Sequence, residues 1–204
     1  MKTMTLQQKD THMDNDTSTP DDLGRRRFGK LLIAAAGVSM TGLGSTATKA
    51  LAEGEGKMNY ASSIDITAPA QKVWDTFKTF GRIDGWHPAT ENCALLVGKE
   101  GEALAVREFG IKGGGFVISE LLAYDEAGMN FDYRIIKTDL PLKNYVARMW
   151  VVDNGNGSVT VNWEATFQHP NLDAATEEEN AITMGLVQGV FKAGLDNIAA
   201  LATA

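Results

Sequence analysis

The sequence contains one cysteine, Cys93, so no disulfide bond can form within the chain. An isolated cysteine is usually a small core residue, and nothing around Cys93 marks it as a nucleophile. The three histidines, His12, His87 and His169, are far apart in the sequence, and no HxH, HxxxH or HExxH pattern is present. We therefore expect neither a metal site nor a bound cofactor.

Motifs for nucleotide binding and for serine hydrolases are also absent. There is no P-loop, no GxGxxG segment that opens a helix and no GxSxG pattern. The glycine triplet at 113–115 lies between two predicted strands, which indicates a loop rather than a phosphate site. The net charge is −7 and the predicted folded part has no basic run, so we expect no nucleic-acid partner.

Residues 1–52 have the order of a secretory signal. Residues 1–24 are polar with almost no apolar periodicity, and we predict that they are disordered. A basic segment follows, then an apolar Ala/Gly-rich run over residues 31–43, then a small-x-small pattern that ends at Ala52. We predict cleavage after Ala52, which leaves residues 53–204 as the mature domain.

The basic segment resembles a twin-arginine signal. It departs from the usual pattern at two positions: Gly24 stands where Ser or Thr is common, and Gly29 stands where Leu is common. The residues that carry the resemblance are Arg25, Arg26, Phe28 and Lys30. This pathway exports folded proteins, so the resemblance implies the twin-arginine export machinery as a partner and the bacterial periplasm as the location. The alternative is an uncleaved membrane anchor, although the apolar run is shorter than the roughly 20 residues that a spanning helix needs. Otherwise we expect only transient membrane contact.

The region 173–202 has the clearest helical periodicity. Thr176 and Glu179 have the spacing of a capping box at its start. Apolar residues recur at three- and four-residue steps, as on one face of an α-helix: Ile182, Leu186, Val187, Val190, Phe191, Leu195, Ile198 and Leu201. The same segment carries a stripe of small residues, Gly185, Gly189, Ala193 and Gly194. The stripe leaves two interpretations open, tight packing on a sheet or room for a ligand.

The region before this helix predicts a strand, a helix pair and six further strands. Ser62–Thr67 alternates, a helix starts near Pro69 and ends at Gly81, and a short turn over Arg82–Trp86 stops before Pro88. Turn residues separate six alternating segments, Cys93–Val97, Leu104–Phe109, Phe116–Tyr124, Met129–Ile136, Tyr145–Val152 and Val159–Phe167. The pattern predicts an α+β fold: a curved antiparallel sheet of about seven strands wrapped on the long C-terminal helix.

Several short motifs between Ala61 and Leu201 point to one superfamily. They are Ile66-Thr67-Ala68-Pro69 with Val73-Trp74, Gly85-Trp86-His87-Pro88, Val106-Arg107-Glu108, Glu120-x-Leu122-x-Tyr124-Asp125, Leu140-Pro141 with Tyr145, Trp163 with Phe167, and Phe191 to Asn197. With the element order, they resemble the START/Bet v 1-like (SRPBCC) superfamily and its polyketide cyclase/dehydrase-like branch, which has the helix-grip fold. The resemblance implies a cavity between sheet and helix that holds an apolar or aromatic small molecule. It does not determine the activity, because this branch includes cyclases, hydroxylase domains and ligand carriers.

The sequence independently supports an apolar lining, although the same bulky side chains could fill the interior as a core. The candidates for this lining are Phe116, Phe131, Tyr133, Met149, Trp163, Phe167, Met184 and Phe191. With the polar candidates, the expected ligand-binding residues are Trp86, His87, Arg107, Glu120, Phe131, Tyr133, Tyr145, Trp163, Met184 and Phe191.

Among the polar candidates, His87 is the best choice for a general acid or base, although no carboxylate stands at a spacing that marks a dyad. The alternative is a bracing role in the turn that contains Pro88. Arg107 and Glu108 are neighbours on one strand, so one of them faces inward and needs a partner. Glu120 is the predicted partner of Arg107, and an anchor for a ligand carboxylate or carbonyl is the alternative.

Three functions remain open on this evidence. The first is an exported binding protein for a hydrophobic or aromatic molecule, which the absence of a catalytic constellation favours. The second is a cyclase- or dehydratase-like enzyme that uses the same cavity, and the third is an accessory protein with a filled core. We expect a monomer or a homodimer.

Overall fold

The computed structural model describes residues 51–52 and 56–204, with residues 51–52 described only by their backbone. The predicted signal residues Arg25, Arg26, Phe28 and Lys30 lie outside the described residues. None of the helices in the described part of the chain combines the length and hydrophobicity that a membrane crossing requires.

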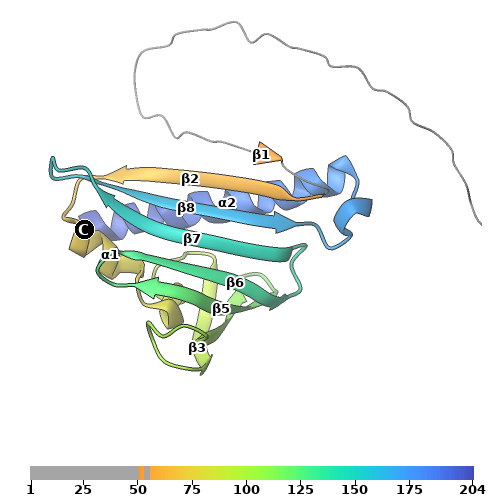
Figure 1. The fold of residues 1–204 in the computed structure, drawn as a ribbon, viewed down its shortest axis with the longest axis horizontal. Coiled ribbons are helices and arrows are strands. Elements are labelled where there is room, and N and C mark those ends of the chain that lie inside the picture. The colour runs from red at the N-terminus through yellow and green to blue at the C-terminus, as the bar shows by residue number, and fades with distance from the viewer. Residues whose placement is uncertain (1–50, 53–55) are drawn as a thin grey trace, which may run out of the picture. The chain divides into compact units, whose positions relative to one another are not determined.

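The described residues form one antiparallel sheet in the order β1-β2-β8-β7-β6-β5-β4-β3 (Figure 1). The strands are β1 (Leu51–Ala52), β2 (Met58–Ile66), β3 (Thr90–Val97), β4 (Val106–Ile111), β5 (Phe116–Asp125), β6 (Asn130–Thr138), β7 (Lys143–Asp153) and β8 (Val159–Gln168). The seven full strands confirm the predicted sheet, and β1 adds two residues beside Met58 and Asn59. Leu104, predicted to begin a strand, instead lies in a turn with φ +68° and is exposed.

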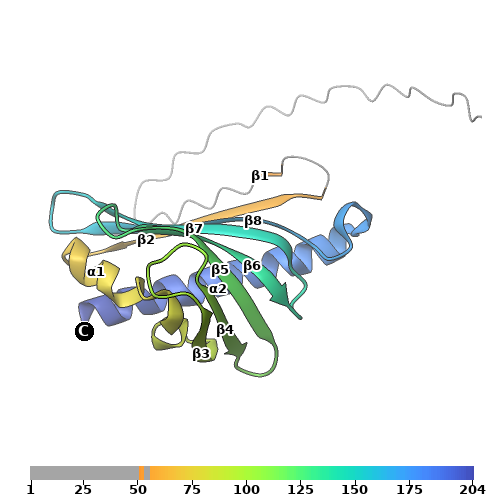
Figure 2. The same ribbon diagram turned by 60° about the horizontal axis from the view of Figure 1, so that its bottom comes forward.

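Four helical segments complete the fold: α1 (Ala70–Phe77), η1 (Phe80–Gly85), η2 (Leu172–Ala174) and α2 (Glu177–Thr203). The capping box at the start of α2 is present, with Thr176 Oγ1 accepting from the Glu179 backbone N–H and the Glu179 carboxylate accepting from the Thr176 N–H. The helix α2 runs across the inner face of the sheet and packs on β2, β8 and α1 (Figure 2). The predicted helix-grip arrangement is therefore confirmed.

Strand alternation decides which side chains face α2. On β8 the inward set is fully buried, as the period of two predicts: Val159, Val161, Trp163, Ala165 and Phe167. On β7 the register places Met149 opposite Trp163, so these two inward side chains lie side by side across the ladder. The outer face carries charges instead, including the ion pair between Arg148 and Asp132.

The interior next to α1 is packed with aromatic rings. Trp74 lies at ring-centroid distances of 5.2 Å from Phe77 and 6.0 Å from Phe131. Phe80 lies 6.4 Å from Phe131, in an edge-on arrangement that aromatic pairs favour. This half of the interior is a filled core. It matches the alternative stated above, in which the bulky side chains pack together instead of lining a cavity.

The small residues of α2 have two different surroundings. A Cβ added to Gly194 would lie 2.8 Å from both His87 Cδ2 and Trp163 Cζ3, so this glycine permits close packing. A Cβ added to Gly185 or Gly189 would meet nothing within 4 Å, and both residues are exposed to solvent. The stripe therefore packs tightly at Gly194, and its other two glycines face away from the sheet.

Candidate ligand-binding cavity

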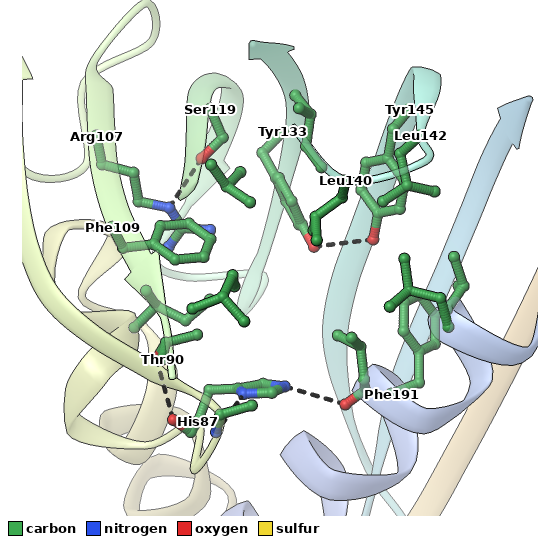
Figure 3. Close-up of a pocket in the computed structure, with 18 of the residues that line it drawn as sticks. His87, Thr90, Arg107, Phe109, Ser119, Tyr133, Leu140, Leu142, Tyr145 and Phe191 are labelled. Atoms are coloured by element: carbon green, nitrogen blue, oxygen red, sulfur yellow. Dashed lines mark hydrogen bonds between the residues drawn. The ribbon is translucent and has the colours of Figure 1, made fainter. Parts of the chain in front are cut away.

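A cavity of about 100 Å³ lies between the sheet and the middle of α2 (Figure 3). Its wall is almost entirely apolar. The lining residues are Ile83, His87, Ala89, Thr90, Arg107, Phe109, Ile111, Val117, Ser119, Tyr133, Ile135, Leu140, Leu142, Tyr145, Trp163, Leu186, Val187, Val190 and Phe191. The interior is thus filled at the α1 end and left open farther along α2.

The sheet opens beside the cavity. The ladder between β6 and β7 ends at the pair Arg134 and Val146, although β6 continues to Thr138. A hollow on the surface at this point shares four lining residues with the cavity: Ile135, Leu140, Leu142 and Tyr145. These four side chains therefore form the wall between the cavity and the outside.

Arg107 projects from β4 into the cavity wall and is only 2% exposed. Its Nε donates to Ser119 Oγ at 2.9 Å and its Nη1 donates to the Phe80 carbonyl at 2.6 Å. The Cζ atom lies 4.0 Å from the centroid of the Phe80 ring, in a cation–π arrangement. Burial lowers the pKa of Arg107 from its usual value, since an apolar environment disfavours the charged form.

Tyr133 and Tyr145 lie across the cavity from Arg107, as Figure 3 shows, with their hydroxyl oxygens 3.2 Å apart. Trp163 Nε1 donates to the Tyr133 hydroxyl at 3.1 Å. Because the two hydroxyls carry one hydrogen each and share a single bond, one hydroxyl hydrogen has no acceptor among the described residues. The pair can therefore donate to an oxygen of a bound molecule.

Both phenols remain protonated at neutral pH. Burial raises the pKa of Tyr133, and burial together with the neighbouring Tyr133 raises the pKa of Tyr145 well above its usual value. These tyrosines are consequently hydrogen-bond donors and not bases.

His87 is a neutral link between the turn before β3 and the helix α2. Its Nε2 lies 3.0 Å from the carbonyl oxygen of Val190, and its Nδ1 accepts from the Ala89 N–H at 3.2 Å. Since a carbonyl only accepts, these partners assign the hydrogen to Nε2. Burial lowers the pKa of His87, and the positive charges of Arg107 and Lys112 act in the same direction. With both nitrogens bonded, His87 has no free lone pair for a ligand, so the bracing alternative fits better than an acid or base role.

Six of the predicted ligand-binding residues line the cavity: His87, Arg107, Tyr133, Tyr145, Trp163 and Phe191. Four do not. Glu120 faces outward and its Oε1 lies 2.9 Å from Arg134 Nη2, which corrects the predicted pair with Arg107. The register explains this difference, because Arg107 stands opposite Ser119 and a shift of one residue reverses the face.

The other three residues lie outside the cavity lining, and their surroundings are as follows. Phe131 belongs to the aromatic core beside α1. Trp86 is buried between Phe77 and Trp163 and lies behind the cavity wall. Met184 is half-buried on α2 and is not part of the lining, whereas its neighbours Leu186 and Val187 are.

Sequence reasoning missed most of the smaller lining residues. Ser119 shares the inward face of β5 with Val117 and Leu121, so strand alternation could have identified it. Thr90 hydrogen-bonds the His87 carbonyl, and no sequence signal places it at the cavity. Within residues 51–52 and 56–204, no three His, Cys, Asp or Glu side chains gather closely enough to hold a metal ion.

Comparison with solved structures shows the same fold. The chain is similar to the XoxI protein from Bacillus cereus, with 20% identity over 69% of this chain and 92% of that one and a TM-score of 0.60. It is also similar to an uncharacterized protein from Bacillus thuringiensis, with 22% identity, coverage of 72% and 99%, and a TM-score of 0.61. A protein from Thermobifida fusca shares 26% identity, with coverage of 69% and 90% and a TM-score of 0.60.

No curated protein sequence matches this chain. A family does match: it is described as "Polyketide cyclase / dehydrase and lipid transport", and the match covers residues 57–203, nearly all of the described fold. The chain therefore belongs to the polyketide cyclase/dehydrase and lipid transport family.

Proposed function

We propose that this protein binds a small hydrophobic or aromatic molecule in the cavity between the sheet and α2. The observation that carries this proposal is apolar space that the chain itself leaves unfilled, in an interior otherwise packed with rings. Protein interiors are close-packed, so space of this kind is unusual in a core that serves stability alone. Family membership supports the same function in its general form.

The size of the cavity limits the ligand. A cavity of about 150 Å³ lined by Leu, Ile and Phe binds benzene, whereas typical drug-sized sites measure roughly 300–1,000 Å³. At about 100 Å³, the cavity suits a short branched chain or a single ring. A larger ligand would have to displace the wall formed by Leu140 and Leu142.

We also propose that the protein works outside the cytoplasm. The support is the twin-arginine-like segment with Arg25, Arg26, Phe28 and Lys30, followed by the apolar run and the small residues that end at Ala52. Export in the folded state would carry the formed cavity, and any ligand already bound in it, to the periplasm.

An enzyme of cyclase or dehydratase type is the second candidate. Arg107 and the unused hydroxyl hydrogen of the Tyr133–Tyr145 pair both face the cavity and could polarise a carbonyl. Such a reaction also needs a group that accepts a proton, and His87 has both nitrogens bonded. The geometry therefore favours binding over catalysis.

The test starts from protein expressed from the full-length chain and purified from the compartment where it accumulates. Native mass spectrometry should detect a co-purified small molecule, or thermal shifts should respond saturably to single-ring apolar compounds. Val190→Phe, which fills the cavity, should abolish binding, and the same change at exposed Val152 should not. Absence of any ligand and any saturable shift, or equal binding by both variants, would contradict the proposal.

A further inference from the structure

Resting on the proposed binding function, we infer that the ligand is a small carboxylic acid, bound as its anion with Arg107 as the counter-charge. The observation behind this inference is a buried cation without an ionic partner. Arg107 is fully buried, and no carboxylate among the described residues forms an ion pair with it. A guanidinium cannot lose its proton in a protein, so the charge persists in the apolar wall.

The acidic side chains near Arg107 are engaged elsewhere. Glu100 is the carboxylate whose charge acts on Arg107, but its Oε1 accepts from the Gly81 backbone N–H at 2.9 Å. Glu120 pairs with Arg134 on the outer face. It follows Ser119, the residue of β5 that stands opposite Arg107. Glu100 thus acts on Arg107 only without direct contact, and no carboxylate of the described residues pairs with the guanidinium. A bound anion could supply the contacting counter-charge, since an unpaired buried charge is strongly unfavourable.

Two hydrogen bonds hold the Arg107 guanidinium in place, and its other N–H groups remain free to donate. Ser119 Oγ and the Phe80 carbonyl use one N–H on Nε and one on Nη1, and the Phe80 ring covers one face. The remaining N–H groups have no acceptor among the described residues. A carboxylate oxygen is the acceptor that a guanidinium binds most strongly in such a position.

The Tyr133–Tyr145 pair offers a second hydrogen-bond donor, for the second oxygen of the ligand carboxylate. The Tyr133 ring centroid lies 5.4 Å from Arg107 Cζ, and the Tyr133–Tyr145 pair has one hydroxyl hydrogen to give. Arg107, Tyr133 and Tyr145 all line the same cavity, so donors of two different kinds border the space that the carboxylate would occupy. The apolar part of the acid would lie against the Phe191 ring, on the side of the cavity away from Arg107 (Figure 3). Leu186 and Val187, on the same helix, also line the cavity.

The experiment compares acids with their amides in isothermal titration calorimetry at pH 7. The pairs are isobutyrate and isobutyramide, benzoate and benzamide, and phenylacetate and phenylacetamide, which match in shape and differ in charge. We expect the best-bound acid to exceed its amide by about 10- to 100-fold in affinity, as for a hydrogen bond to a charged group. The affinity of the acid should fall as the pH drops below the pKa of the acid itself, and that of the amide should not.

Arg107→Met should lower the affinity for the acid by more than it lowers that for the matching amide. The amide carbonyl loses only a hydrogen-bond donor, whereas the carboxylate also loses its counter-charge. Replacing an unpaired buried charge by an apolar chain of similar volume is expected to preserve folding. The control is Arg148→Met, which changes an arginine on the outer face and should leave both affinities unchanged. If Arg107→Met fails to fold, the wild-type comparison and its pH profile decide the question.

Equal binding of acid and amide, or tighter binding of the amide, would overturn the inference while leaving the proposed binding function in place. Failure of every acid to bind would overturn it as well. The proposed function is judged separately, by the co-purified molecule and by the Val190→Phe variant.

Discussion

His87 donates its Nε2–H to the carbonyl oxygen of Val190, 3.0 Å away, and so joins residues that are 103 positions apart in the chain. This bond fixes the turn before β3 against α2 at the edge of the cavity. The ring also lies edge-on to Trp163, with centroids 6.2 Å apart. His87 therefore positions the helix that closes the cavity.

The first prediction concerns the stability of the protein at acidic pH. Because burial lowers the pKa of His87 in the folded state, the unfolded chain takes up its proton first as the pH falls. The stability that depends on neutral His87 is thus complete above its ordinary pKa of about 6.5 and is lost as the pH falls below that value. Urea unfolding of wild type and His87→Gln from pH 8 to pH 5 should show a weaker pH dependence in the variant.

An NMR titration provides the direct check on this assignment. The ring resonances of His87 should report neutral Nε2–H imidazole at pH 7. A midpoint at or above the ordinary histidine value would contradict the lowered pKa of His87. Ring resonances typical of the Nδ1–H form would show that the assigned tautomer is wrong.

The second prediction compares two glycines of α2. Alanine normally stabilises a helix interior by about 1 kcal/mol relative to glycine, and Gly189→Ala should do so because its Cβ meets nothing. Gly194→Ala should instead lower the free energy of unfolding by about 1–3 kcal/mol, since its Cβ would lie 2.8 Å from His87 and Trp163. Chemical denaturation of both variants tests this, and a stabilised Gly194→Ala would contradict the packing described for α2.

The third prediction concerns alkaline pH. The pKa values of Tyr133 and Tyr145 are raised in the folded state, so above about pH 10 the unfolded chain loses protons that the folded chain keeps. Stability should fall as the pH rises through this value. Tyr145→Phe should reduce the slope in urea denaturation from pH 9 to pH 11, and an unchanged slope would mean that Tyr145 ionises in the folded protein.

The fourth prediction concerns export. Changing Arg25 and Arg26 together to lysine should leave the precursor in the cytoplasm, because a twin-arginine signal requires the arginine pair and not only its charge. Fractionation with immunoblotting and the mass of the exported form measure location and cleavage. Lys49→Arg is a charge-neutral control in the same segment, and normal secretion of the double lysine variant would exclude this route.

Local patterns determined most of the fold. Alternation along Val159–Phe167 and the three-to-four-residue steps in α2 depend only on near neighbours in the chain, so the sequence predicts them directly. The capping box at Thr176 and Glu179 is local in the same way. For these features the sheet, the covering helix and the inward face follow from the residues themselves.

The tertiary structure alone decided the site. The sequence requires one of Arg107 and Glu108 to face inward, but only the strand register shows that Arg107 does so, opposite Ser119, while Glu120 points outward to Arg134. The two roles of the α2 glycines and the bond from His87 to Val190 also depend on segments far apart in the chain. Register and helix placement are set by many weak contacts acting together, so no single stretch of sequence encodes the volume of the cavity or the partners of the charge beside it.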